Sequence, residues 1–138
     1  MNQPIYNDGY SACSETYSTL CIYHNEKLPS DVTARLGIEP DREILKEEAP
    51  TRHTKSNGWF FGTKGKLQSR DSRRHIDWIV DRLEAKKDDV LCMTNEGYDI
   101  SIFSLWVSES ANGGPKLSPY QMHRLSELNI EVSWDIYL

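Results

Sequence analysis

The run of residues 98–107 (YDISIFSLWV) constrains the fold more than any other part of the chain. Along an extended backbone its apolar side chains alternate between two faces, with Ile100, Ile102 and Trp106 on one and Phe103, Leu105 and Val107 on the other. Because both faces are mainly apolar, we expect a central strand that is covered on both sides.

Other segments also have the composition of strands. Residues 16–24 are rich in aromatic and β-branched side chains, and residues 58–63 form an aromatic run limited by glycines. Residues 44–45 indicate a short strand within an acidic, turn-rich stretch. Residues 130–138 alternate apolar and polar side chains, which predicts a half-buried strand.

Three helices are expected between these strands. The longest runs from 71 to about 87, because Ile76, Ile79, Val80 and Leu83 follow the spacing of one helical stripe. Arg73 and Asp77 are four residues apart and are expected to pair on its outer side.

The two shorter helices have recognisable ends. One begins with Ser30 as a capping residue and closes at Gly37. The other begins at Ser118 and Pro119 and ends at Asn129. Its buried stripe is predicted to comprise Met122, Leu125 and Leu128.

The order of these elements predicts a single α+β domain over residues 13–138, preceded by a flexible leader at 1–12. We expect a mainly antiparallel or mixed sheet of four to five strands, packed with two to three helices. A ferredoxin-like split βαβ core with an extra helix and strand is one topology that fits this order.

Several segments of the chain resemble a known family. They are Ala85-Lys86-Lys87 at the end of the long helix, the strand at 98–107, Gly113-Gly114, Leu117-Ser118, the stretch 125–130 and the ending Trp134-Asp135-Ile136-Tyr137. Trp59 also matches. The chain resembles, over residues 14–138, a family of short bacterial proteins known as a domain of unknown function (family 4279). The resemblance implies a bacterial or phage source and a single α+β domain, and it transfers no catalytic residue.

The charge of the chain is segregated. The whole sequence of 138 residues carries a net charge of -5, which disfavours nucleic acid and anionic membranes as partners. Residues 52–74, however, carry +6, between flanks of -5 and -6. The bases of this middle segment are Arg52, Lys55, Lys64, Lys66, Arg70, Arg73 and Arg74.

Two opposite readings of these charges follow. The basic segment is interleaved with the aromatic side chains of residues 59–61, which would suit nucleotide or nucleic-acid binding. Its bases would equally suit pairing with the acidic flanks, with Trp59 and Phe61 in the core. The acidic cluster of Asp41, Glu43, Glu47 and Glu48 would suit a basic protein partner or a solvated loop.

No catalytic motif or cofactor-binding motif is present in the sequence. Cys13, Cys21 and Cys92 lack the paired spacing of a zinc site, and the four histidines are isolated. His75 and Asp77 are two residues apart on a predicted helix and do not face each other. No cofactor is therefore expected, and an enzyme is the less favoured class.

We therefore expect a non-enzymatic interaction protein of the bacterial cytoplasm, in its most concrete form an immunity or antitoxin-like protein that neutralises a toxin. No stretch has the roughly 20 apolar residues of a membrane span, and the first ten residues lack the pattern of a secretory signal. The interface anchors that we expect are large aromatic side chains: Tyr6, Tyr10, Tyr17, Tyr23, Tyr120 and Trp134. The alternatives are a nucleotide or nucleic-acid binder and an uncharacterised hydrolase. If the final strand lies at a sheet edge, it offers a pairing surface for a second copy.

Overall fold

The alternation of apolar and polar side chains produces five strands in the computed structural model, which describes residues 2–48 and 55–138. The strands are β1 (Cys13–His24), β2 (Arg42–Ile44), β3 (Asn57–Gly62), β4 (Asp99–Ser108) and β5 (Glu131–Tyr137). Four helices accompany them: α1 (Pro29–Leu36), α2 (Ser72–Glu84), α3 (Lys87–Asn95) and α4 (Pro119–Glu127).

The strands form one mixed sheet in the order β2-β3-β1-β4-β5. All neighbours are antiparallel except β4 and β5, which are parallel and are joined through α4. Since β3 lies between β1 and β2, the unit β1-α1-β2 is a split βαβ unit. The chain is a single α+β domain, as the sequence predicts.

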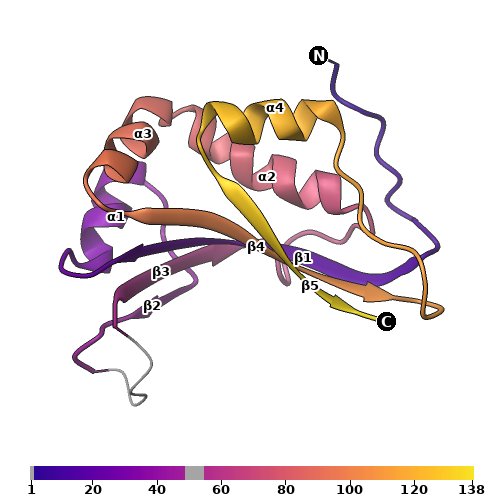
Figure 1. Cartoon of the computed structure of the whole chain (residues 1–138), viewed down its shortest axis with the longest axis horizontal. Helices are drawn as coiled ribbons and strands as arrows, with labels where there is room; N and C mark the ends of the chain where they lie inside the picture. The colour runs from indigo at the N-terminus through magenta and orange to yellow at the C-terminus, as the bar shows by residue number, and fades with distance from the viewer. Residues whose placement is uncertain (1, 49–54) are drawn as a thin grey trace.

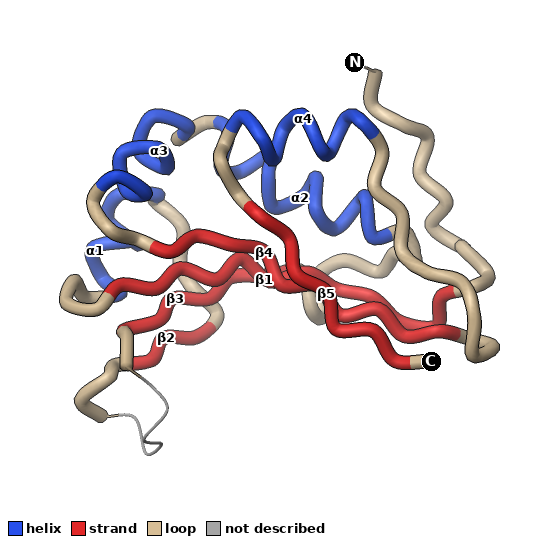
Figure 2. The backbone as a smooth tube through the Cα atoms, in the orientation of Figure 1, coloured by secondary structure: helices blue, strands red, loops and turns tan. Residues whose placement is uncertain are grey.

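The helices cover one face of this sheet (Figure 1). Figure 2 shows α2, α3 and α4 together above the strands, with nothing of comparable extent below them. The core lies between these layers, and its largest fully buried side chains are Trp59, Trp106, Leu20, Ile22, Ile76, Ile79, Leu83, Met93, Ile102 and Leu128. The prediction that Trp59 and Phe61 belong to the core is confirmed.

β4 is an interior strand between β1 and β5, but it is covered on one side only, whereas the sequence predicts a strand covered on both sides. Ile100, Ile102 and Trp106 are buried beneath the helices. On the other side Phe103 is 38% exposed, and Leu105 and Val107 are only half-buried. The apolar character of this second side therefore does not reflect a second layer within the described chain.

The helix predicted from 71 to about 87 corresponds to α2, and a further helix, α3, follows it that the sequence did not predict. α2 ends at Glu84, and Lys86 leaves the helical conformation with φ -122° and ψ 30° before α3 begins. The direction of the chain changes here because Leu83 of α2 and Val90 and Met93 of α3 all reach the core. Asp88 and Asp89 consequently lie in the first turn of α3, where acidic side chains suit the helix dipole.

Two details of the shorter helices also differ from the prediction. Leu28 rather than Ser30 is the N-cap of α1, with Pro29 as its first residue, whereas Gly37 closes the helix in the left-handed conformation as expected. In α4, Met122 is 54% exposed. The buried stripe instead includes Gln121, whose Oε1 accepts a hydrogen bond from the Ser118 backbone at 2.8 Å.

Residues 5–8 of the expected leader lie against the start of α2. The Tyr6 hydroxyl donates to Asp77 Oδ2 at 2.5 Å, and the Asn7 backbone donates to Asp71 Oδ2 at 2.7 Å. Asp8 accepts from Arg74 Nε at 2.7 Å. Burial and the bond to Asp77 raise the pKa of Tyr6 to about 12. This segment thereby adds polar contacts to the helix layer.

Candidate interaction surface

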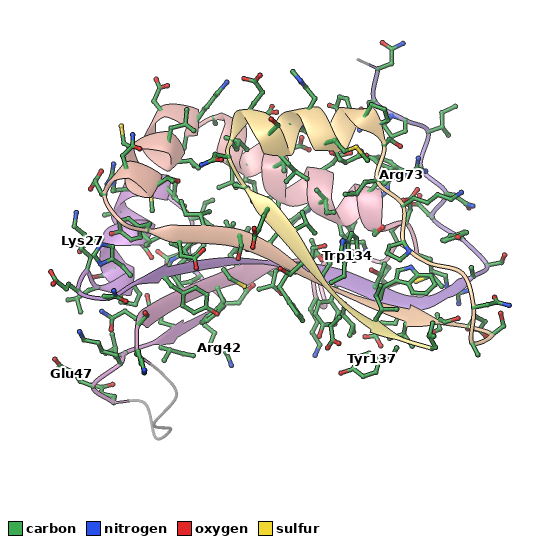
Figure 3. All side chains as sticks on the ribbon, viewed as in Figure 1. Lys27, Arg42, Glu47, Arg73, Trp134 and Tyr137 are labelled. Atoms are coloured by element: carbon green, nitrogen blue, oxygen red, sulfur yellow. The ribbon has the colours of Figure 1, made fainter. Side chains whose placement is uncertain are left out.

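The face of the sheet that the helices leave uncovered is called the open face below. Its side chains come from every second residue of the strands, as the registers between neighbouring strands show. They are Glu15, Tyr17, Thr19, Cys21, Tyr23, Arg42, Ile44, Phe60, Asp99, Ser101, Phe103, Leu105, Val107, Glu131, Ser133, Asp135 and Tyr137. In Figure 3, Arg42 and Tyr137 point away from the helices, while Trp134 lies on their side of β5.

Aromatic side chains from strands that are distant in sequence lie close together on the open face. The rings of Tyr23 and Phe60 meet edge-on with centroids 5.5 Å apart. Phe103 is 38% and Tyr137 55% exposed. Large, rigid aromatic side chains of this kind are the commonest anchors of protein interfaces.

Two cations lie over aromatic rings of this face. The Arg42 guanidinium is 4.6 Å from the centroid of Phe60, and the Lys64 ammonium is 5.1 Å from that of Tyr17. These cations cover part of the aromatic surface, and their charged ends remain accessible because both residues are exposed.

A shallow cavity of about 380 Å³ occupies the middle of the open face. The cavity is lined by Tyr17, Thr19, Cys21, Tyr23, Arg42, Phe60, Ser101, Phe103 and Ser133. Its volume would hold a protruding side chain or a small ligand. Cys21 is not suited to act there as a nucleophile, because burial raises the pKa of its thiol to about 11.

The rim of the open face is more acidic than basic. Glu15, Asp99, Glu131 and Asp135 lie on the strands that form it, against the bases Arg42 and Lys64. The Tyr137 hydroxyl bonds to Asp135, which raises the pKa of Tyr137. A partner for this surface would need an apolar centre and a basic border.

The four acidic residues that the sequence singles out do not form one patch. Asp41 precedes β2, where it pairs with Lys66 at 2.8 Å and accepts from the Gly62 backbone at 2.8 Å. Glu43 is opposite Trp59, on the helix side of the sheet. Glu47 and Glu48 lie in the turn at the other end of β2, as Figure 3 shows for Glu47.

The bases of the predicted anion site are dispersed in the same way. Lys66 pairs with Asp41, Arg73 with Asp71 at 2.7 Å and Arg74 with Asp8 at 2.7 Å. Arg73 also lies in a part-buried pocket of acceptors, donating to Ser118 Oγ at 2.9 Å. Burial raises the pKa of Asp71, but its bonds to Arg73 outweigh this and lower it overall.

The other bases of that segment divide into three cases. Lys64 and Arg70 line a cavity of about 330 Å³ between the N-terminal segment, β1 and the loop after β3, and Asp8 and Glu15 line it too. Lys55 is exposed just before β3. Arg52 lies outside the described residues. Among the described bases, those brought together at this cavity therefore face acids as well.

Asp77 is not the surface partner of Arg73 that the sequence suggests. It is 2% exposed, and Arg124 Nη1 and Gln121 Nε2 both donate to it at 2.8 Å. Arg124 additionally binds Asp81 at 2.6 Å and Glu84 at 2.8 Å. This network joins α2 to α4 and has the geometry of a structural clamp.

His75 belongs to a second buried network. Its Nε2 donates to the Ser69 carbonyl at 2.8 Å, and its Nδ1 accepts from Thr63 Oγ1 at 2.6 Å. The Ser18 backbone donates to Thr63 Oγ1 at 3.0 Å. Burial lowers the pKa of His75 below its ordinary value of 6.5, so the neutral ring is a fixed link between α2, β3 and β1.

The aromatic anchors expected from the sequence are distributed over several surfaces. Tyr17 and Tyr23 lie on the open face, but Trp134 points to the helix side and Tyr6 contacts Asp77. Phe103 and Tyr137, which are exposed on the open face, are not in the expected set, and Phe60 lies on the same face but is only 7% exposed. The alternation of residues 98–107 is the signal that identifies Phe103, once that strand is known to have one uncovered side.

The fold and this face define a class, a two-layer α+β domain with an uncovered aromatic sheet face. The chain belongs to the family described as Domain of unknown function (DUF4279), whose model matches residues 14–138. No curated protein and no solved structure matches the chain significantly. In residues 2–48 and 55–138, no helix is long and apolar enough to span a bilayer. The same residues hold no group of three or more His, Cys, Asp or Glu side chains arranged for a metal.

Proposed function

We propose that this chain is a non-enzymatic interaction protein of the bacterial cytoplasm that binds a protein partner through the open face of its sheet. In its most concrete form it is an immunity or antitoxin-like protein that occupies a basic toxin. The observation that carries the proposal is the aromatic open face, which the described part of the chain leaves uncovered.

The chemistry of that face supports a protein as the partner. Phe103 and Tyr137 would supply anchors near its centre and at one corner, and the cavity between β1, β3 and β4 would receive a side chain of the partner. The acidic rim would attract a basic protein and speed its approach. Glu131 and Asp135 are the acids that β5 contributes to this face.

The alternative functions have weaker support. Nucleic acid would require a surface of unpaired bases, whereas Lys66, Arg73 and Arg74 each bind an acid. A hydrolase would require a nucleophile with a base, and the buried pair Thr63 and His75 is engaged in bonds to Ser18 and Ser69. The cavity lined by Lys64 and Arg70 remains the place where a small anion would bind.

The test uses the protein encoded by the neighbouring gene, co-expressed with this chain and titrated calorimetrically against it. We expect relief of toxicity and a complex that Phe103→Ala weakens by about 30-fold, the effect of an interface hot spot. Met122→Ala is the matched control, because Met122 is 54% exposed on α4, away from the open face.

Three results would contradict the proposal. They are the absence of any complex, equal losses from Phe103→Ala and Met122→Ala, and a complex that weakens only when Lys64 or Arg70 is replaced. The last result would favour anion binding in the cavity of about 330 Å³.

A further inference from the structure

The two edges of the sheet differ in how they are protected. β2 has three residues, of which Arg42 and Glu43 are exposed and charged. Short, charged edges of this kind resist pairing with another strand. β5 has seven residues and contains neither lysine nor proline, and its two charged residues, Glu131 and Asp135, both lie on the open-face side. In Figures 1 and 2, β5 crosses in front of β4, with its outer side toward the viewer.

The outer side of β5 has backbone groups available for pairing. Its inner side pairs with β4 from Glu131 to Tyr137. In a parallel pair only every second residue directs its N–H and C=O toward the neighbour, so the alternate residues direct theirs outward. Among the described residues, no further hydrogen bond to the backbone of Glu131–Tyr137 is present. The C-terminal end of β5 and the residue after the strand also carry exposed apolar side chains, since Ile136 is 45% and Leu138 76% exposed.

The geometry points to a second copy of this chain as the occupant of that edge, with β5 pairing antiparallel to β5 around a two-fold axis at Trp134. Symmetry restricts which residues can lie opposite each other. A two-fold axis normal to the sheet puts the open faces of both copies on the same side. Odd-numbered residues then lie opposite odd-numbered residues, and even-numbered residues opposite even-numbered ones. The axis at Trp134 pairs all seven residues of β5, whereas an axis at Ser133 or Asp135 pairs five.

Charge selects the same register. With the axis at Ser133, Glu131 would lie opposite Asp135, and with the axis at Asp135 the two Asp135 side chains would lie opposite each other. Both arrangements place like charges in direct contact, which is destabilising. With the axis at Trp134, Asp135 lies opposite Ser133 and Glu131 opposite Tyr137, and the two Asp135 side chains are only diagonal neighbours.

The same register makes the helix side of the junction apolar. Val132 then lies opposite Ile136, and the two Trp134 side chains meet at the axis. In the monomer Val132 and Trp134 already pack against the core while remaining partly exposed. Pairing would therefore cover apolar surface as well as backbone, and it would set the two open faces side by side in one ten-stranded sheet. This inference does not depend on the proposed function.

The first experiment measures the mass of the purified chain by sedimentation equilibrium across a range of concentrations. We expect a dimer of twice 15.9 kDa. Ile136→Lys should raise its dissociation constant at least about 100-fold, because a lysine would be placed in the apolar junction. Met122→Lys, with the same change at an exposed methionine of α4, should leave the dimer intact.

The second experiment reports the register and does not rely on a destabilising variant. In a Cys92→Ser background, which removes the exposed native thiol, the double variant S133C/D135C should form a disulfide-linked dimer under mild oxidation. S133C alone should not, because with the axis at Trp134 its copies are too far apart for the Cβ distance of about 3.8 Å that a disulfide needs. D135C alone should fail for the same reason.

The proposal is overturned by a wild-type chain that stays monomeric at millimolar concentration. A dimer that survives Ile136→Lys, with that variant correctly folded by circular dichroism, would also overturn it. Efficient cross-linking of S133C alone or D135C alone would place the axis elsewhere and reject this register. Binding of the neighbouring protein is read independently at Phe103, so either proposal can fail without the other.

Discussion

The two faces of the sheet use the same strands and differ in almost everything else. On the helix side, Leu20, Ile22 and Ile102 are fully or almost fully buried, and the buried polar pair Ser18 and Ser104 is satisfied by a bond of 2.6 Å between their hydroxyls. On the open face, aromatic rings alternate with Thr19, Ser101 and Ser133, and charges stand at the rim. Aromatic content alone therefore does not distinguish a buried core from an exposed face of the sheet, whereas burial and polar neighbours do.

The largest expected difference in stability is between alanine substitutions of one aromatic residue from each face. Trp59→Ala should lower the free energy of unfolding by about 4 kcal/mol, since Trp59 is fully buried and a cavity would remain. It would also lose the bond from Trp59 Nε1 to Thr33 Oγ1 at 3.0 Å. Phe103→Ala should cost less than about 1 kcal/mol because Phe103 is 38% exposed. Urea unfolding measures both, and equal losses would show that a second layer covers the open face.

Replacing a buried arginine and an exposed arginine should give a similar difference in stability for charged residues. Arg124→Met should cost about 3 kcal/mol, because Asp77 would stay buried without its charged partner. Arg42→Met on the open face should change stability by less than about 0.5 kcal/mol, because Arg42 is exposed and its guanidinium contacts the ring of Phe60 without an ion pair among the described residues. The measurement is again urea unfolding. An Arg124→Met variant as stable as the wild type would show that the bonds from Tyr6 and Gln121 are enough to satisfy Asp77 without Arg124.

Substitutions on the open face are expected to cost little stability, but Gly62, which lies opposite Thr19 on this face, should be an exception. A Cβ at this position would lie 2.5 Å from the Ser18 carbonyl oxygen, which belongs to the backbone of β1 and cannot move aside cheaply. Gly62→Ala should therefore cost about 2 kcal/mol in thermal or urea unfolding. A neutral result would indicate that β1 and β3 separate more readily than their register suggests.

The smallest effect concerns pH and involves the helix side alone. Burial lowers the pKa of His75 in the folded state below its ordinary value of 6.5, so protons favour the unfolded chain. The contribution of the neutral ring is fully present above pH 6.5, and stability should decline as the pH falls from there toward 5, before carboxylates titrate. His75→Gln should flatten the unfolding free energy over this window. A wild-type curve that is already flat would contradict the assignment.

The sequence predicts the positions of the helices and strands better than it predicts which other elements pack against them. Hydrophobic periodicity identifies β4 and α4, and the turn residue Gly37 fixes the end of α1, because these signals are local. The separate helix α3 was not predicted, because no proline or glycine marks its start and only Val90 and Met93 of its residues are buried. The exposure of Met122 likewise depends on which side of α4 the clamp of Arg124 and Asp77 occupies.

The candidate surface follows the same division. Alternation assigns Tyr17, Tyr23 and Phe103 to one side of their strands, and that much is readable from the residues. Whether that side is covered depends on all four helices lying on the opposite side, which no local pattern specifies. The charge segregation is real in the sequence, but Lys66 and Arg74 pair with acids of the N-terminal flank and Arg73 pairs with Asp71 inside the segment, so these bases do not form an unpaired patch.

The position of β1 at the centre of the sheet has a consequence for how the chain folds. β1 is the first strand in sequence, yet it pairs with β3 and β4, and its Tyr23 lies opposite Asp99, 76 positions later. Such distant pairing slows folding. On a ribosome adding roughly 5–20 residues per second, β1 would wait about 4–17 s for β4 to be completed. During that time Leu20 and Ile22, which the finished fold buries, would be exposed to other nascent chains and to chaperones.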